Sequence, residues 1–365
     1  MSTTPQSLRL RHTLQSTYPW TASPLIISAP MRVLTGPSLA HAVLLAGGLP
    51  FIGPGLTPSS THTDLSAFAA LLPTPPSPDA LLPVGIAFQL WTSSLPDALS
   101  AITAHPPAAA WLFAPRNGQA EVDEWIVAVR ATSPRTQIWL QIGTLTEAMD
   151  AVVGSSTPPD VVVVQGAEAG GHGRGKDGSG FITLLPEIAD ALAAAGRGDV
   201  PLVAAGGIVD GRGVVGALGV GAAGAAMGTR FLAAREARIA RGYQDEVVRA
   251  RDGGRNTVRT QLWNHLRGTF GWPEAWSPRG VINRSWVEQQ EGVGFEELQK
   301  RHDEVMKKGD EAWGPEGRTA TYAGAGVGLV KKVMGAGDIV EEVRSEAREI
   351  ITALQGLVEA APMRD

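Results

Sequence analysis

His172 stands in an unusual setting, because it lies among glycines in the loop that follows four consecutive valines. The valines at 161–164 predict a strand that is buried on both faces, as in parallel sheets. Glycines at 166, 170, 171 and 173 would let the following loop pass close to a flat or phosphorylated ligand. The histidine would place a group that exchanges a proton beside that ligand. This stretch therefore predicts a ligand site with acid–base chemistry.

Two further apolar stretches end in glycine turns, at Gly206-Gly207 and at Gly228-Thr229. We expect each turn to open a helix, whose free N–H groups and dipole would suit a phosphate dianion. In a barrel of eight strand–helix units, the loops after strands seven and eight commonly form such a phosphate site. The two turns together predict a phosphate site next to the histidine loop.

Strand and helix patterns alternate along the chain and would position these loops. Eight strands, each followed by a helical segment, predict an α/β fold that closes into a (β/α)8 TIM barrel. The expected strands are 25–29, 50–53, 83–88, 109–113, 137–142, 160–165, 200–205 and 223–227. Helix-start signals support this interpretation, with Pro37 at a first helical position and Thr144 with Glu147 at capping-box spacing.

The pattern divides the chain into four parts. We expect an N-terminal arm over 1–23, the barrel over 24–240, a helical lid or subdomain over 241–322, and a C-terminal helix over 323–365 that packs back on the barrel. No repeating strand–helix unit fits the third part, which is rich in tryptophan. The tryptophans of its 263–286 segment would either wall the ligand site or pack the lid onto the barrel.

Composition excludes several classes of protein. The 365 residues include no cysteine, so disulfides, thiolate metal sites and cysteine nucleophiles are excluded. A formal net charge of −5 gives no general attraction to nucleic acid or to an anionic membrane. No apolar run is long enough for a transmembrane helix. No group of His, Asp and Glu has a convincing metal spacing, so we expect neither a metal nor a nucleic-acid or membrane partner. A homodimer is left open.

The N-terminus leaves two interpretations of location. Asp64 is the first acidic residue, and the opening residues are rich in serine and threonine with two arginines. We expect a cytoplasmic protein whose N-terminal arm packs on the barrel. A mitochondrial transit peptide, and so the mitochondrial matrix, is the alternative.

The barrel interpretation brings several predicted strand ends to one face of the molecule. Glutamine amides there could hydrogen-bond a planar heterocycle, although they could also be structural. A phosphate at one end and amide-bonding groups at the other fit flavin mononucleotide (FMN) better than a sugar phosphate. The residues expected to hold it are Ala29, Pro30, Met31, Gln89, Gln141, Gln165, Gly166, Ala169, Gly170, Gly171, Gly206, Gly207, Gly228 and Thr229.

Four motifs of this sequence resemble those of the nitronate monooxygenase family, formerly called 2-nitropropane dioxygenases. They are Ser-Ala-Pro-Met at 28–31, Gln-Gly-Ala-Glu-Ala-Gly-Gly-His-Gly at 165–173, Ala-Ala-Gly-Gly-Ile-Val-Asp-Gly-Arg-Gly at 204–213 and Met-Gly-Thr-Arg-Phe-Leu-Ala at 227–233. Residues 272–274, Arg279-Gly280 and Asn283 are similar to the lid of fungal-type members. The resemblance implies an FMN-dependent (β/α)8 enzyme, with His172 as its catalytic histidine and Ile208 among the cofactor residues.

The resemblance implies that alkyl nitronates or nitroalkanes react with O2 to give a carbonyl compound and nitrite, with His172 as general base. The alternative is an NAD(P)H-dependent FMN reductase acting on a quinone or an enoyl thioester. A flavin-holding module without turnover is a third interpretation, which the intact histidine motif disfavours. A barrel like that of inosine-monophosphate dehydrogenase is excluded, because its chemistry needs a cysteine nucleophile and this chain has no cysteine. Gln141 stands where some relatives have a lysine, so the flavin would meet a neutral group there.

Overall fold

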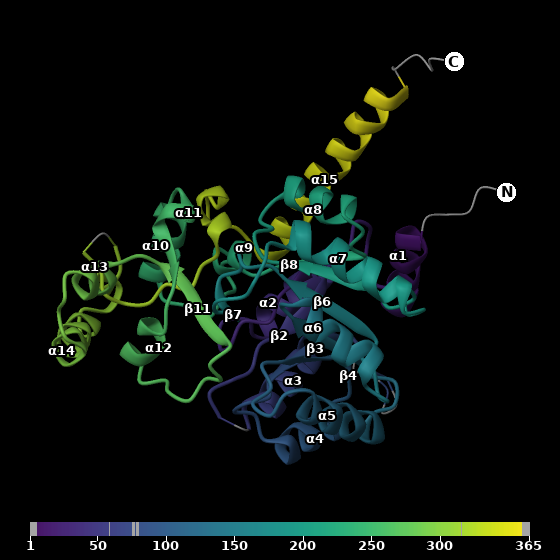
Figure 1. Ribbon diagram of the computed structural model, residues 1–365, viewed down its shortest axis with the longest axis horizontal. Helices are drawn as coiled ribbons and strands as arrows, with labels where there is room; N and C mark the ends of the chain where they lie inside the picture. The colour runs from purple at the N-terminus through teal and green to yellow at the C-terminus, as the bar shows by residue number, and fades with distance from the viewer. Residues whose placement is uncertain (1–5, 58, 75–76, 78–79, 315, 360–365) are drawn as a thin grey trace.

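The computed structural model describes residues 6–57, 59–74, 77, 80–314 and 316–359. Within these residues, eight parallel strands form a closed barrel, in which the last strand pairs with the first. All eight predicted strands are confirmed, and so is the TIM-barrel class (Figure 1). The strands are β1 (Ile26–Ser28), β2 (Leu49–Ile52), β3 (Leu82–Gln89), β4 (Pro107–Phe113), β5 (Gln137–Ile142), β6 (Val161–Gln165), β8 (Leu202–Ala205) and β9 (Gly224–Met227).

Helices surround the barrel, and several begin at the residues that the sequence indicates. Pro37 is the first residue of its helix, and the Ser94 and Thr144 side chains accept hydrogen bonds from the backbone N–H groups of Asp97 and Glu147. Such caps satisfy N–H groups that the first helical turn leaves free. The helices are α2 (Pro37–Leu45), α3 (Ser60–Leu71), α4 (Leu95–Ala104), α5 (Gln119–Thr132), α6 (Leu145–Met149) with the π-turn η1 (Asp150–Gly154), α7 (Phe181–Ala194) and α8 (Gly211–Gly219).

Alternate residues of the strands point into the barrel, where large aromatic rings fill the space. Phe51 contacts both Trp111 and Trp139, at ring-centroid distances of 5.0 and 5.1 Å. The helix α1 (Gln6–Thr17) leads to Tyr18, whose hydroxyl accepts a hydrogen bond from Trp139 Nε1 at 2.7 Å. The interior of the barrel is therefore a packed core. Ligand sites in such barrels form at the carboxyl ends of the strands.

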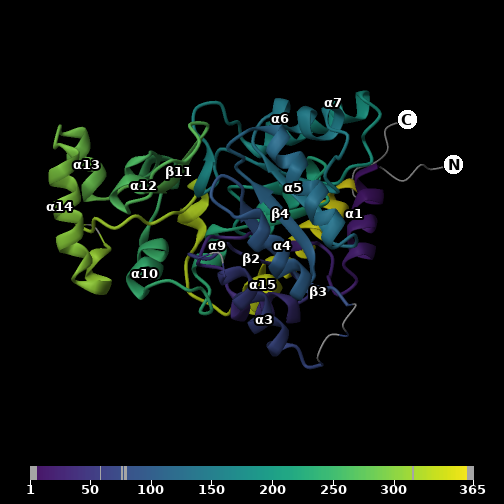
Figure 2. The ribbon, with the colours of Figure 1, turned by 90° about the horizontal axis from the view of Figure 1, so that it is seen from below.

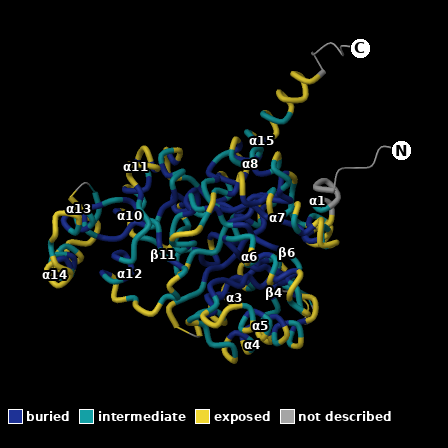
Figure 3. The backbone as a smooth tube through the Cα atoms, viewed as in Figure 1, coloured by how far each residue is buried: buried dark blue, intermediate teal, exposed yellow. Residues whose placement is uncertain are grey.

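Residues 241–322, here called the lid segment, lie beside the barrel in both ribbon views (Figures 1 and 2). The expectation that this segment is helical is only partly right, because two of its strands join β7 (Gly171–Arg174) in a three-stranded antiparallel sheet. Most of its other residues are helical, and its outer helix α14 is largely exposed, whereas α13 is only partly exposed (Figure 3). Its elements are α10 (Arg241–Arg249), α11 (Gly253–Asn256), β10 (Thr257–Arg259), α12 (Leu262–Leu266), β11 (Trp276–Val281), α13 (Arg284–Gln290), α14 (Phe295–Met306) and η2 (Gly309–Ala312).

The lid segment leaves the barrel after the short helix α9 (Thr229–Leu232), and the chain returns through η3 (Ala325–Leu329) to α15 (Ala336–Glu359). The long helix begins at Ala336, so the C-terminal helix is shorter than the expected range of 323–365. The helix α15 packs on α8 and α2, and its buried Arg344 donates hydrogen bonds to the Ala46 and Gly47 carbonyls. Among the described residues, no helix is both long and apolar enough to span a membrane.

Candidate active site

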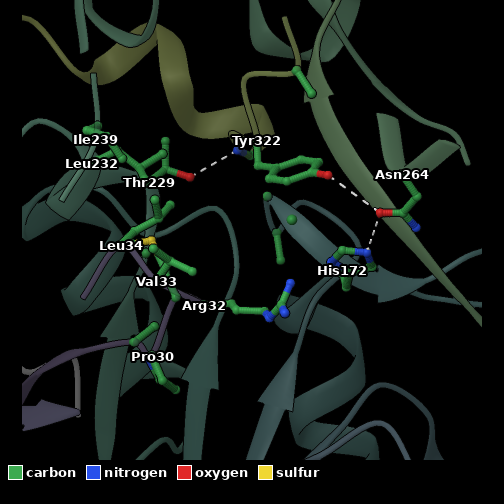
Figure 4. A pocket seen from close by; sticks show the side chains of 18 of the residues that line it. Pro30, Arg32, Val33, Leu34, His172, Thr229, Leu232, Ile239, Asn264 and Tyr322 are labelled. Atoms are coloured by element: carbon green, nitrogen blue, oxygen red, sulfur yellow. Dashed lines mark hydrogen bonds between the residues drawn. The ribbon is translucent and has the colours of Figure 1, made fainter. Parts of the chain in front are cut away.

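A cavity of about 870 Å³ opens at the carboxyl ends of the barrel strands, between the barrel and the lid segment (Figure 4). Ligand sites of TIM barrels form at this end. Every residue that the sequence nominated for the cofactor or for catalysis lines the cavity, with Gly166 as the exception. Gly166 lies just outside it, where its N–H group donates to the Ala205 carbonyl at 2.8 Å.

The two glycine turns border this cavity in different ways. Gly206 and Gly207 have φ angles of +96° and +74°, the left-handed region that glycine adopts without strain. They do not open a helix, so that expectation is wrong: α8 begins at Gly211, where Asp210 caps it. Gly228 does precede a helical turn, and it has room for a side chain, because a Cβ added there would meet no atom closer than Met31 Sδ at 3.7 Å. Backbone amides in both turns can therefore approach a phosphate closely.

Three glutamine amides line the cavity at the ends of β3, β5 and β6. Gln141 accepts a hydrogen bond from Trp111 Nε1 at 2.9 Å, which leaves its own N–H groups to donate. Gln165 donates to the His172 carbonyl at 3.1 Å. The side-chain oxygens of Gln89 and Gln165 are buried without a hydrogen-bond partner among the described residues. Buried amides with unused hydrogen-bonding capacity fit a heterocycle that carries both donors and acceptors, such as a flavin ring.

His172 lies in the short strand β7 and not in a free loop. Its register partner is Pro278 of β11, so the lid segment fixes its backbone. Its half-buried ring stacks on Trp272 at a centroid distance of 3.6 Å and an angle of 9°. The Nε2 atom lies 2.9 Å from Asn264 Oδ1 (Figure 4). Strand pairing, stacking and this hydrogen bond together hold the imidazole in one orientation.

Electrostatics keep the His172 ring neutral. Burial is the largest cause that lowers its pKa, and the nearby cations Arg259, Arg267 and Arg32 act in the same direction while the Asn264 hydrogen bond opposes them, so that the pKa falls from 6.5 to about 3. The ring is therefore uncharged at neutral pH, with one nitrogen free to accept a proton.

Arg32 and Arg267 give the cavity a positive potential. The Arg32 side chain reaches toward His172 (Figure 4), and its neighbour Val33 has a φ of +69°, which is strained for a β-branched residue. The Arg267 guanidinium lies 5.3 Å from the Tyr322 ring centroid. Neither arginine forms an ion pair with an acidic side chain in the described part of the chain. Two uncompensated cations beside a neutral histidine favour an anionic ligand.

Arg259 of β10 holds the histidine loop in place. Its guanidinium donates to the carbonyls of Gly171 and Ala169, at 2.9 and 2.8 Å, and also to those of Ala167 and Ser277. Burial and the neighbouring Arg279 lower its pKa. The Glu168 carboxylate, which lies in this loop, makes no described hydrogen bond to His172.

Sequence reasoning missed the site residues that the lid segment supplies. Arg259, Asn264 and Arg267 follow no local motif, and Asn264 is separated from His172 by 92 positions. The tryptophan-rich segment was the available signal, and both of its expected roles occur. Trp272 stacks on His172, whereas Trp276 is buried in a cluster with residues of the barrel core. Within the described residues, no group of three His, Asp or Glu side chains could hold a metal ion.

Comparison with known proteins places these features in a family. A family model described as nitronate monooxygenase matches residues 129–346. The chain is 59% identical, over 348 residues, to nitronate monooxygenase npaC of Metarhizium robertsii, and the match covers 94% of this chain and 96% of that protein. Two solved structures share the fold: FabK from Thermotoga maritima (TM-score 0.72, 22% identity, 94% of this chain and 98% of that one) and nitroalkane oxidase from Streptomyces ansochromogenes (TM-score 0.70, 23% identity, 93% and 99%).

Proposed function

The chain belongs to the nitronate monooxygenase family and is an oxidoreductase, and on this basis we propose that it oxidises small alkyl nitronates, and the nitroalkanes that give rise to them, at FMN bound in the cavity. The second substrate is O2, and the products are a carbonyl compound and nitrite. The observation that carries the proposal is the neutral His172 beside two uncompensated arginines.

His172 acts as the general base on a neutral nitroalkane. It takes the acidic proton from the carbon next to the nitro group, and the resulting nitronate is an anion. Arg32 and Arg267 stabilise the negative charge that develops on the nitro oxygens. Formation of this anion also favours the imidazolium, because an opposite charge nearby raises the pKa that burial had lowered. A nitronate supplied ready-made needs only the arginines.

The residues around the cavity fit FMN. The amides at Gly206-Gly207 and Gly228-Thr229 would hold its phosphate, and the amides of Gln89, Gln141 and Gln165 would bond the edges of its ring. FMN held by these residues would supply the electron acceptor for the nitronate and a route for electrons to O2. Two nitronates and one O2 balance as two carbonyl compounds and two nitrite ions. Trp272 and the lid segment cover His172 and limit water near the reacting carbon.

Oxygen uptake measured together with nitrite release tests this function. FMN-loaded protein should consume O2 and form nitrite when an alkyl nitronate is added, and the cofactor that denaturation releases should be FMN. Protein without flavin is the control and should do neither. Quinone reduction driven by NADH, without O2 uptake on nitronate, would replace the proposal with a reductase.

A further inference from the structure

We propose that Asn264 and Gln261 are positioning residues that lock His172 as its Nε2–H tautomer, so that Nδ1 is the atom that exchanges the proton. Both residues belong to the lid segment, at and beside α12. Only the second part, in which Nδ1 exchanges the proton with the substrate, rests on the proposed function. The tautomer itself follows from hydrogen-bond direction and can be measured without turnover.

The direction of the hydrogen bonds is set by a backbone carbonyl. The Trp276 carbonyl can only accept, so the Gln261 side chain must present its Nε2 there, at 2.7 Å. The Gln261 Oε1 atom then faces Asn264 and accepts from its Nδ2, also at 2.7 Å. This orientation leaves the Asn264 Oδ1 atom facing His172. Neither amide can turn over without placing two oxygens or two N–H groups against each other.

The histidine must therefore carry its proton on Nε2. This nitrogen lies 2.9 Å from Asn264 Oδ1, and an oxygen acceptor requires a hydrogen between the two atoms. Asn264 is 1% exposed, so water does not replace the contact. The Tyr322 hydroxyl lies 3.5 Å from the same oxygen, too far to satisfy it well. Because a neutral imidazole has one proton, Nδ1 is left with a free lone pair.

The charged groups around the ring agree with a neutral tautomer. Arg32 follows β1, Arg259 lies in β10 and Arg267 follows α12, and all three disfavour an imidazolium. Tyr322 faces the ring from the returning chain at a centroid distance of 5.9 Å, and burial raises the pKa of its hydroxyl, which stays protonated. The two side-chain amides of Gln261 and Asn264, here called the amide relay, orient the imidazole without giving it a charge. A carboxylate at position 264 would instead pair with an imidazolium.

Nitrogen NMR of ¹⁵N-histidine-labelled, FMN-loaded protein tests the proposal at neutral pH. The His172 signals are assigned from their loss in His172→Asn. In the wild type we expect a protonated Nε2 and an unprotonated Nδ1. In Gln261→Met the ratio of the two tautomers should fall by roughly fivefold or more, the worth of one buried hydrogen bond. In Asn264→Asp both nitrogens should become protonated, and nitroalkane oxidation should acquire an acid limb that the wild type lacks above pH ~5.

Gln299→Met is the matched control. The Gln299 Nε2 atom also donates to a backbone carbonyl in the lid segment, that of Leu266 at 3.1 Å, but the side chain does not touch His172. This variant should keep the wild-type tautomer. A proton on Nδ1 in the wild type would overturn the proposal, and so would Gln261→Met and Asn264→Asp spectra that match the control. The expected NMR result in a protein that fails to oxidise nitronates would refute the proposed function and leave the relay intact.

Discussion

At the scale of single residues, the proposed chemistry depends on a histidine whose setting comes from three parts of the chain. The connection after β6 provides β7, which carries His172, the loop after β1 provides Arg32, and the lid segment provides Trp272 and Asn264. The sequence could nominate His172, because glycines flank it after a buried strand. It could not nominate Asn264, since a buried amide on a short helix leaves no pattern in a sequence.

Replacing His172 by asparagine should separate the two kinds of substrate. Asparagine keeps one polar contact but cannot take up a proton near neutral pH. Its kcat/KM for neutral nitroalkanes should fall by roughly 10²–10⁴, the usual scale of general-base catalysis, while that for pre-formed nitronates falls much less. Steady-state kinetics on both substrates, at equal flavin content, provide the measurement.

The pH profile of the wild type gives the control for this interpretation. Because the pKa of His172 is lowered to about 3, the base form persists as the pH falls through 6.5, and nitroalkane oxidation should lose no activity to its protonation between pH 8 and 5. An acid limb near pH 6.5 in the wild-type profile would contradict the neutral state of the His172 ring. For the variant, equal losses on both substrates in His172→Asn would instead assign His172 to anion or flavin binding.

At the scale of elements, the barrel strands could be predicted because their apolar runs are local signals. The strand β7 could not, since Gly-His-Gly-Arg has no strand pattern and becomes extended only by pairing with β11, about a hundred residues later. The helical expectation for the lid segment missed β10 and β11 for the same reason. Arg259 lies in β10, the edge strand of this small sheet farthest from β7. Its guanidinium stabilises the pairing because it donates hydrogen bonds to carbonyls of the histidine loop.

The turn between β9 and α9 allows a clean test of the phosphate site. Gly207 is unsuitable, because its φ of +74° would strain any side chain. A side chain at Gly228 meets no atom closer than 3.7 Å, so Gly228→Asp should fold. Its carboxylate would face the phosphate dianion and weaken FMN binding by at least about a hundredfold, as expected for like charges a few ångströms apart. Flavin titration measures the affinity.

Gly294→Asp provides the comparison for this turn, since position 294 in the lid segment faces open space. It should bind FMN as the wild type does. Normal flavin content in folded Gly228→Asp would show that the phosphate lies elsewhere.

At the scale of the whole molecule, the lid segment is inserted between the last barrel strand and α15, a helix that packs between α8 and α2. The core of the barrel supports the site from one side, and the inserted segment closes it from the other. The barrel class follows from the alternating strand and helix patterns, the position of the site follows from the glycine turns, and the family follows from the resemblance of the motifs. The contacts that tune His172 do not, because they arise only where these two parts meet.

Anaerobic stopped-flow mixing of FMN-loaded protein tests the central claim most directly. An alkyl nitronate should bleach the oxidised flavin absorbance within the time of a turnover, and O2 should restore the absorbance, because the nitronate is the electron donor. NADH should bleach it slowly or not at all. Rapid bleaching by NADH with none by the nitronate would contradict the account and identify a reductase built on the same barrel.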